Sequence, residues 1–303
     1  MKQQSQAYLY GISAVLMWST VATAFKLALR YLTPLQLMAI ASLSSSVILT
    51  IILLLQGKLH LTKRYLRQHF RFYLLLGLIN PFCYYLILFK AYELLPAQQA
   101  QPLNYTWAIT LSLLAVPLLG HKLHRFDFAA MLLGYLGVVV IATQGNLLQL
   151  HFTSLPGVAL ALLSTLFWAG YWILNQRRKD DPIAGLLCSF ILSLPITCIA
   201  MFVNEGFPTL HWQGLLGGIY VGCFEMGVTF ACWVLALKKT EKTARISNLI
   251  FISPFLSLYL IAKFLGETIH PSTYFGLVLI IVGLLLQQYG NYWQIHRQHT
   301  SID

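Results

Sequence analysis

The stretches Gly120-His121-Lys122-Leu123-His124 and Gly266-Glu267-Thr268-Ile269-His270 decide the fold, because the second repeats the spacing of the first in the other half of the chain. Leu16-Met17-Trp18 returns in the same way as Leu166-Phe167-Trp168. The repeat continues to one further glycine in each half, Gly137 and Gly283. Each half holds five apolar stretches, and because five is odd, the second half must enter the membrane from the opposite side. Inverted repeats of this kind are typical of transporters that bind substrate between the two halves.

The composition places the chain in a membrane. Of its 303 residues, 58% are apolar and only 10% are charged, whereas soluble domains carry about 25% charged residues. A helix needs about 20 apolar residues to cross the hydrocarbon. The sequence therefore predicts an all-α integral membrane protein with ten transmembrane helices, arranged as two inverted five-helix repeats over residues 1–145 and 146–303. The expected spans are Ala7–Leu29, Pro34–Leu55, Phe72–Leu95, Ala97–Leu119, Phe126–Thr143, Leu155–Asn175, Ile183–Val203, Trp212–Leu237, Ala244–Leu265 and Thr273–Tyr289.

Lysine and arginine predict the orientation, because they collect in the short cytoplasmic loops of membrane proteins. With the N-terminus inside, all but four of the 20 Lys and Arg residues fall on the cytoplasmic side. The four on the outer side are Lys26, Arg30, Lys90 and Lys263. We therefore expect a multi-pass protein of the inner (plasma) membrane with both termini in the cytoplasm. The net charge of +11 then reflects topology, and nucleic acid is not an expected partner.

The cysteines and histidines indicate no cofactor. All five cysteines lie inside expected spans and none forms a C-x-x-C pair, which is typical of small buried side chains. His121 and His124 have no carboxylate or thiol partner at a metal-binding spacing. We expect neither a metal ion nor an organic cofactor.

Several short motifs point to one family. The chain resembles the EamA-like members of the drug/metabolite transporter superfamily in the Leu-Met-Trp and Leu-Phe-Trp triplets, Ser253-Pro254-Phe255, Gly266-Glu267 and the pair Gly276 and Gly283. His121 departs from the family pattern, because it stands where the second half has Glu267. The resemblance extends over nearly the whole chain. It implies a ten-helix carrier whose central cavity is lined by helices one to four of each half, with the fifth helices at the periphery.

Glu225 is the one acidic residue deep within an expected span. A charge at that depth costs roughly 2.5–3.5 kcal/mol on insertion scales, so such a residue indicates a functional site. Aligning the third and eighth spans at Gly77 and Gly222 puts Asn80 opposite Glu225. Pro81 also opens the helix there, because proline removes a backbone donor. We expect Glu225 and Asn80 to bind substrate; the alternative for each is a structural, hydrogen-bonded group, with Glu225 then neutral.

Aromatic and polar side chains accompany these two residues. Tyr84 lies one helical turn from Asn80, and Thr229 lies one turn from Glu225. The other expected substrate-binding residues are Trp18, Trp168, Tyr105, Trp107, Tyr171, Asn104 and Asn248. An acid among ring faces suits an amine, or the ammonium group and ring of an aromatic amino acid. The alternative for any single aromatic residue is core packing or anchoring at the membrane interface.

Other charges lie near the ends of spans. Lys26, Lys90 and Lys263 fit side chains that reach for the membrane surface; the alternative is that they bind a substrate carboxylate or pair with Glu225. The Asp180-Asp181 pair, next to three basic residues of an inner loop, suggests a solvated face.

The fifth and tenth spans carry few polar groups and contain Gly134, Gly137 and Gly276. Small residues allow helices to approach closely. These spans therefore pack within the chain or form a contact between two subunits, so that the protein is a monomer or a homodimer through its fifth and tenth helices. Its expected partners are the lipid bilayer and a small-molecule substrate.

The sequence favours a secondary-active transporter of small organic metabolites, such as amino acids, amines or related aromatic or cationic solutes, working by alternating access. No G-x-x-x-x-G-K-[ST] motif for ATP is present. The alternatives are a membrane channel or a non-transporting scaffold, and a scaffold would leave Glu225 without a role. An intramembrane enzyme has less support, because one buried acid is too few for the common hydrolytic mechanisms.

Overall fold

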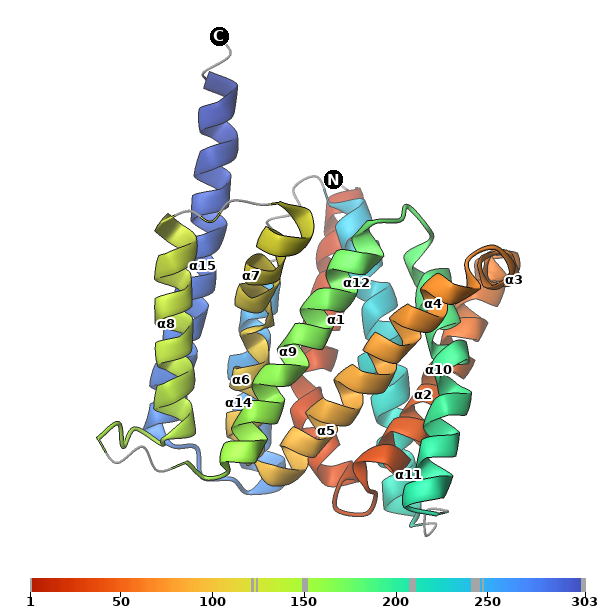
Figure 1. Cartoon of the computed structure of the whole chain (residues 1–303), viewed down its shortest axis with the longest axis horizontal. Coiled ribbons are helices and arrows are strands. Elements are labelled where there is room, and N and C mark those ends of the chain that lie inside the picture. The colour runs from red at the N-terminus through yellow and green to blue at the C-terminus, as the bar shows by residue number, and fades with distance from the viewer. Residues whose placement is uncertain are drawn as a thin grey trace.

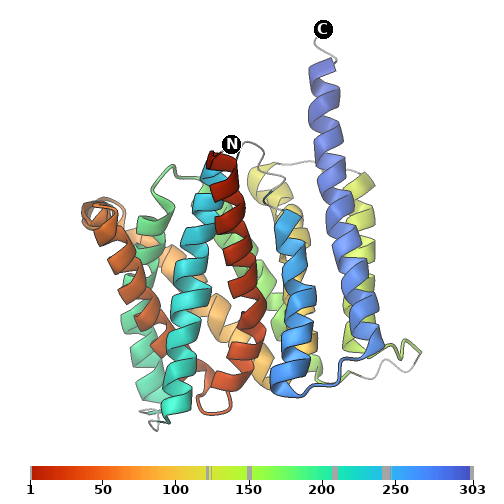
Figure 2. The same ribbon diagram turned by 180° about the vertical axis from the view of Figure 1, so that it is seen from behind.

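The computed structural model describes residues 2–120, 123, 125–148, 152–206, 211–240, 246 and 248–300. Within these residues every regular element is a helix, and ten helical spans are long and apolar enough to cross a membrane. The prediction of an all-α membrane fold is therefore confirmed. The spans run side by side, and both ends of the chain lie at the same end of the bundle (Figures 1 and 2).

In the first half of the chain, the third and fourth spans are each divided into shorter segments. The helices are α1 (Lys2–Ala28), α2 (Pro34–Leu55), α3 (Leu59–Gln68), α4 (Phe70–Gly77), the π-helix η1 (Leu78–Cys83), α5 (Tyr84–Leu94), α6 (Ala97–Tyr105), α7 (Trp107–Leu119) and α8 (Arg125–Ala142). The bounds of the spans agree with the sequence expectations to within a few residues. The short helix α3 is not expected from the sequence, because it lies between two of the expected spans.

The second half is divided at corresponding places. Its helices are α9 (Leu155–Gln176), α10 (Pro182–Asn204), α11 (Trp212–Tyr220), the π-helix η2 (Val221–Val228), α12 (Thr229–Lys239), the 3₁₀-helix η3 (Asn248–Ile252), α14 (Ser253–Leu265) and α15 (Pro271–Thr300). The first residues of the expected ninth span, Ala244, Arg245 and Ser247, lie outside the described residues. So does His121, the residue that stands in place of Glu267.

The repeated Gly-x-x-x-His stretches end equivalent helices. Gly120 closes α7 with a φ of 71°, and Gly266 closes α14 with the same φ. A left-handed backbone at this position favours glycine, because glycine has no Cβ to clash with the helix. The stretch that decided the fold from sequence is therefore a pair of helix ends.

Helices of one half pack mainly against helices of the other. α1 lies along α12 and α14, and α9 lies in the reciprocal way along α5 and α7. α2 packs against α10, and α8 pairs with α15 at the edge of the bundle (Figures 1 and 2). Two inverted repeats would produce this reciprocal pattern. The division of the chain at residue 145 stays a prediction.

Two glycines permit close helix crossings between the halves. A Cβ at Gly77 would lie 2.5 Å from the carbonyl oxygen of Ser189 on α10. A Cβ at Gly222 would lie 2.2 Å from the carbonyl oxygen of Ala41 on α2. Ala41 lies as many residues after Pro34, the first residue of α2, as Ser189 lies after Pro182, the first residue of α10. The two crossings are therefore at equivalent positions in the two halves. Glycine at these sites therefore sets how closely the halves approach.

The glycines of the fifth and tenth spans are used within the chain. A Cβ at Gly137 would lie 2.5 Å from the carbonyl oxygen of Gly276, and one at Gly276 would lie 2.7 Å from that of Gly137. The faces of α8 and α15 that carry Gly137 and Gly276 are therefore packed against each other. A homodimer stays a prediction, and it would use other faces of these two helices.

Candidate functional site

The expected site lies where two spans are irregular. The π-helical turns η1 and η2 interrupt the third and eighth spans at corresponding places, and they carry Asn80 and Glu225 respectively. Asn80 has an extended backbone, with φ −146° and ψ 117°, directly before Pro81. π-Helical turns inside longer helices frequently mark functional sites. The two polar residues that sequence alignment paired therefore both lie in π-helical turns, and Asn80 in addition has a non-helical backbone.

One carboxylate oxygen of Glu225 accepts a hydrogen bond, and the other has no hydrogen-bond partner among the described residues. The Tyr85 hydroxyl donates to Glu225 Oε1 at 3.2 Å, and the side chain of Trp18 also interacts with the carboxylate. Glu225 Oε2 is shielded from solvent and has no hydrogen-bond partner in the described part of the chain. An acceptor held in this state is costly unless a ligand or water completes it.

Asn80 repeats this arrangement in the other half. Its side chain is buried and interacts with the Tyr171 hydroxyl of α9. Glu225 has a comparable aromatic partner in Trp18, which lies on α1. Asn80 Oδ1 has no hydrogen-bond partner among the residues described. Each half thus supplies one incompletely bonded polar group at corresponding places.

Trp168 is the centre of an aromatic cluster beside Asn80. Its ring centroid lies 4.7 Å from that of Tyr84, 6.0 Å from that of Tyr171 and 6.4 Å from that of Trp107. Trp172 adds a further ring at 6.0 Å. The Trp168 side chain is only half-buried, so part of it stays accessible. Four of the expected aromatic residues, Trp168, Tyr84, Tyr171 and Trp107, therefore lie together. That they bind substrate stays a prediction.

The remaining expected residues have differing surroundings. Asn104 accepts from the Tyr84 hydroxyl at 3.3 Å and donates to Ser164 Oγ at 3.0 Å, so its amide holds Tyr84 in place. The Tyr105 side chain interacts with Ser253 of α14. Two further residues show no sign of facing a ligand: the buried Thr229 hydroxyl donates to the carbonyl of Phe224, and Asn248 is exposed at the start of η3.

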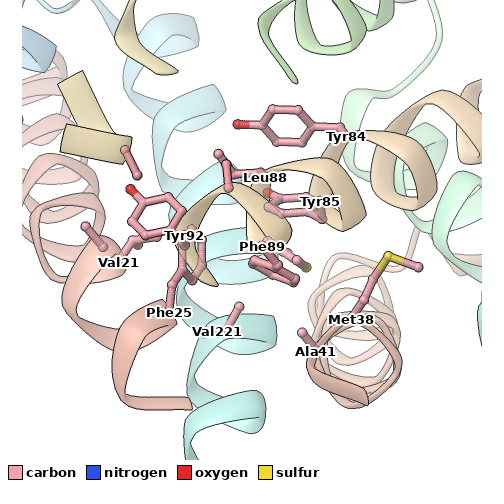
Figure 3. Close-up of a cluster of buried hydrophobic side chains, with 14 of the residues drawn as sticks. Val21, Phe25, Met38, Ala41, Tyr84, Tyr85, Leu88, Phe89, Tyr92 and Val221 are labelled. Atoms are coloured by element: carbon pink, nitrogen blue, oxygen red, sulfur yellow. The ribbon is translucent and has the colours of Figure 1, made fainter. Parts of the chain in front are cut away.

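An apolar cluster lies next to the site along α5. In Figure 3, Phe89 and Tyr92 of α5 point toward Phe25 of α1, with ring centroids 4.9 Å and 5.2 Å from that of Phe25. Tyr85, which bonds Glu225, begins the same row of side chains. Along α5 the cluster lies between Tyr85 and the turn between α5 and α6.

The turn between α5 and α6 is held by two charges. Lys26 Nζ donates to the carbonyls of Tyr92 and Leu95 at 2.6 and 2.9 Å, at the C-terminal end of α5. The Glu267 carboxylate accepts from the backbone N–H groups of Ala97 and Gln98 at 2.9 and 3.1 Å, at the start of α6. Each charge has the sign that the helix end favours. We name these contacts the α5–α6 latch.

A cavity of about 300 Å³ lies beside the latch. It is lined by Lys26, Leu29, Arg30, Glu93, Leu265 and Glu267. Lys26 is therefore neither a partner of Glu225 nor a surface charge in this structure, because its ammonium group is bound to helix carbonyls. The other two lysines of the span ends also have local partners: Lys90 pairs with Glu93 at 2.5 Å, and Lys263 lies over the ring of Tyr259.

Comparison with known proteins identifies the fold. The model of the EamA-like transporter family matches residues 5–143 and 155–287. The chain belongs to the EamA-like transporter family. It is therefore a multi-pass membrane transporter and not an enzyme, and the resemblance inferred from its motifs is confirmed.

Relatives within this EamA-like family share about a quarter of its residues. The uncharacterised transporter YvbV of Bacillus subtilis is 24% identical over 276 residues, or 90% of this chain and 88% of its own. The aromatic amino acid exporter YddG of Ancylobacter novellus is 24% identical over 262 residues, or 85% and 88%. A probable amino-acid metabolite efflux pump of Escherichia coli is 24% identical over 231 residues, or 72% and 76%. One solved crystal structure has the same fold, with a TM-score of 0.65 and 22% identity over 93% of this chain and 96% of the other.

Tyr85 is the site residue of this EamA-like protein that sequence reasoning missed. The sequence favours Tyr84, because it lies one α-helical turn after Asn80. The extended backbone of Asn80 and the wider turns of η1 change the helical phase, so Tyr84 turns toward Trp168 while Tyr85 reaches Glu225. The adjacent pair of tyrosines after an Asn-Pro interruption is the signal that could have found it.

Proposed function

We propose that the chain is a secondary-active transporter that moves aromatic amino acids or related amines out of the cell by alternating access. The observation that carries this proposal is the unpartnered, shielded Oε2 of Glu225. A substrate ammonium group would donate to that oxygen, and hydrogen bonds between charged groups are among the stronger ones in proteins.

The aromatic cluster supports an aromatic substrate. A ring bound beside Trp168 would gain offset or edge contacts, and the ammonium group would be attracted to ring faces. Tyr84 and Tyr85 belong to the first half, whereas Trp168 and Glu225 belong to the second. A substrate between them would contact both halves, as alternating access requires. The names of two relatives, an aromatic amino acid exporter and an amino-acid metabolite efflux pump, favour this substrate class and the outward direction.

The proposal includes the inner membrane and two cytoplasmic termini. The basic helix α3 lies at the same end of the bundle as both termini (Figure 1). Lysine and arginine are concentrated on the cytoplasmic side of such proteins. The α5–α6 latch and its cavity then face the outside, and the latch must break before substrate can leave on that side.

The latch predicts a measurable loss of stability in one variant. Glu267→Ala removes the carboxylate that caps α6, and the loss of a helix cap costs about 0.5–2 kcal/mol. We expect thermal unfolding of the purified protein at a clearly lower temperature. Glu93→Ala is the control, because Glu93 lines the same cavity but makes an exposed pair, worth about 0–1 kcal/mol. Equal unfolding temperatures for the Glu267→Ala and wild-type proteins would show that the Glu267 contacts of the latch contribute nothing to stability.

The aromatic cluster predicts weaker substrate binding in another variant. Trp168→Ala removes the central ring, and contact between a cation and an aromatic ring contributes about 0.5–2 kcal/mol. We expect substrate affinity, measured by ligand-dependent thermal stabilisation, to fall about 2- to 30-fold. Trp212, an exposed residue at the start of α11, provides the control variant Trp212→Ala. If the Trp168→Ala protein binds aromatic amino acids as tightly as the wild-type protein does, the aromatic cluster is not part of the binding site.

Transport in proteoliposomes tests the function itself. We expect saturable exchange of radiolabelled phenylalanine, tyrosine or tryptophan, with competition by aromatic amines. Flux that rises without saturation would indicate a channel instead. Competition by sugar phosphates or dicarboxylates, without competition by amines, would show that the substrate class is wrong.

A further inference from the structure

The helix α3 carries a basic surface that the transport site does not use. The segment 57–71 contains five Lys or Arg residues and no acidic residue. Four of the five are exposed: Lys63, Arg64, Arg67 and Arg71. None of these four makes an ion pair with a described residue. Lys63, Arg64 and Arg67 lie in α3, and Arg71 lies in the first turn of α4. We refer to the four residues together as the α3 basic face.

The position of α3 brings this face to the membrane surface. The helix joins the second span to the third, so it lies where the chain leaves and re-enters the membrane. Figure 1 looks along the axis of α3, while the spans run vertically, so α3 lies across the ends of the spans. It also lies at the periphery of the bundle in both views (Figures 1 and 2). A helix at the edge of the bundle and at the end of the spans would be in reach of lipid headgroups.

The opposite face of α3 is docked on the second half of the chain. The Tyr65 hydroxyl accepts from the backbone N–H of Asp181 at 3.0 Å, and its ring stacks on Tyr73 at 5.9 Å. The Cys188 thiol donates to the carbonyl of Thr62 at 3.6 Å. Lys58, just before the helix, pairs with Asp181 at 2.9 Å. These contacts fix the orientation of α3, so the basic face is held outward.

The nearby acids cannot neutralise the basic face. Burial opposes ionisation of Asp181, but hydrogen bonds from Lys58 and from the backbone of Ala184 outweigh it and hold its pKa below the usual value. Asp180 accepts from Arg178 at 2.5 Å and from the Tyr73 hydroxyl at 2.6 Å. Asp180 and Asp181 are therefore partly buried and bonded to partners on several elements, which corrects the expectation that they form a solvated face.

We propose that the α3 basic face binds the headgroups of anionic phospholipids. A docked amphipathic helix with several Lys and Arg side chains at the membrane surface attracts such lipids. The fold does not itself require α3, because residues 205–211 make the equivalent connection in the second half with a much shorter segment and no Lys or Arg. The inference does not rest on the proposed substrate.

The test compares two lipids on the full-length protein in neutral detergent. We expect short-chain phosphatidylglycerol to raise the unfolding temperature more than phosphatidylcholine of the same chain length. Each basic charge contributes about a fivefold gain in affinity, so the triple variant Lys63→Gln, Arg64→Gln, Arg67→Gln should bind phosphatidylglycerol about a hundredfold more weakly. Raising the ionic strength to about 1 M, where the Debye length is about 3 Å, should remove the preference of the wild-type protein.

A matched control variant distinguishes lipid binding at the α3 basic face from a general effect of positive charge on the protein. Arg177→Gln, Lys179→Gln, Lys238→Gln removes three charges that are also exposed at the same end of the bundle, outside α3. We expect this control to keep the phosphatidylglycerol preference. Equal losses in the two triple variants, or no preference in the wild-type protein, would overturn the proposal. If the α3 variant fails to fold, the salt dependence of the wild-type protein still decides whether anionic lipid binds by charge, and a salt-independent preference would overturn it.

Discussion

Replacement of Glu225 by glutamine is expected to reduce transport at low substrate concentration about 10- to 100-fold while the protein still folds. The amide keeps the size of the side chain and can still accept from Tyr85. It removes the negative charge that would bind a substrate ammonium group, and hydrogen bonds to charged groups contribute about 1.5–3 kcal/mol. The measurement is the KM for substrate exchange in proteoliposomes, together with the unfolding temperature of the purified variant.

Two controls make the Glu225→Gln result specific. Glu93→Gln removes a carboxylate that is exposed at the cavity beside the α5–α6 latch, and it should leave the KM unchanged. If Glu225 exchanges a proton during transport, the glutamine variant should also lose the part of the pH dependence that this residue provides, because an amide does not titrate between pH 5 and 9. Wild-type rates in Glu225→Gln at every pH would contradict the proposed site.

Replacement of Gly222 by alanine is expected to be among the most damaging single changes outside the site. The new Cβ would lie 2.2 Å from the carbonyl oxygen of Ala41, so α2 and η2 must move apart. Overpacking of this kind costs about 1–3 kcal/mol or more. We expect a large fall in the unfolding temperature and in the yield of folded protein. Gly77→Ala should behave similarly, because its Cβ would meet the carbonyl oxygen of Ser189 at 2.5 Å.

Gly170 provides the matched control for these variants. It lies within α9, and a Cβ there would have no atom within 4 Å. Alanine in a helix is more stable than glycine by about 0.5–1 kcal/mol, so Gly170→Ala should be neutral or slightly stabilising. If Gly222→Ala and Gly170→Ala unfold at the same temperature, the crossing of α2 and η2 does not limit the approach of the halves.

The spans could be predicted from sequence because apolar length is a strong and local signal. The ten spans follow from composition and from the repeated glycines, and the structure places their ends within a few residues of the expected ones. α3 was missed for the opposite reason. It is a short helix whose buried face consists of a few residues, such as Thr62 and Tyr65, and its docking partner Asp181 is remote in the sequence.

The candidate site could be predicted in part. Glu225 stands out because an acid within an apolar span is costly, and Trp168 stands out because the repeat supports it. The partner of Glu225 could not be assigned from spacing, because a single extended residue at Asn80 changes the phase of everything after it. The α5–α6 latch was also missed, because Glu267 and Lys26 bond to main-chain atoms that carry no residue-specific signal.

The reciprocal packing of the halves has a consequence for biosynthesis. α1 finds its main neighbours in α12 and α14, and α2 finds its own in η2 and α10, all of which are synthesised after the first half has left the ribosome. Until the later helices are inserted, the early helices therefore lie in the bilayer without their main neighbours. Their glycine faces and Asn80 are then exposed to lipid. A ribosome that stalls between the halves would leave a nascent fragment that is inserted but cannot mature.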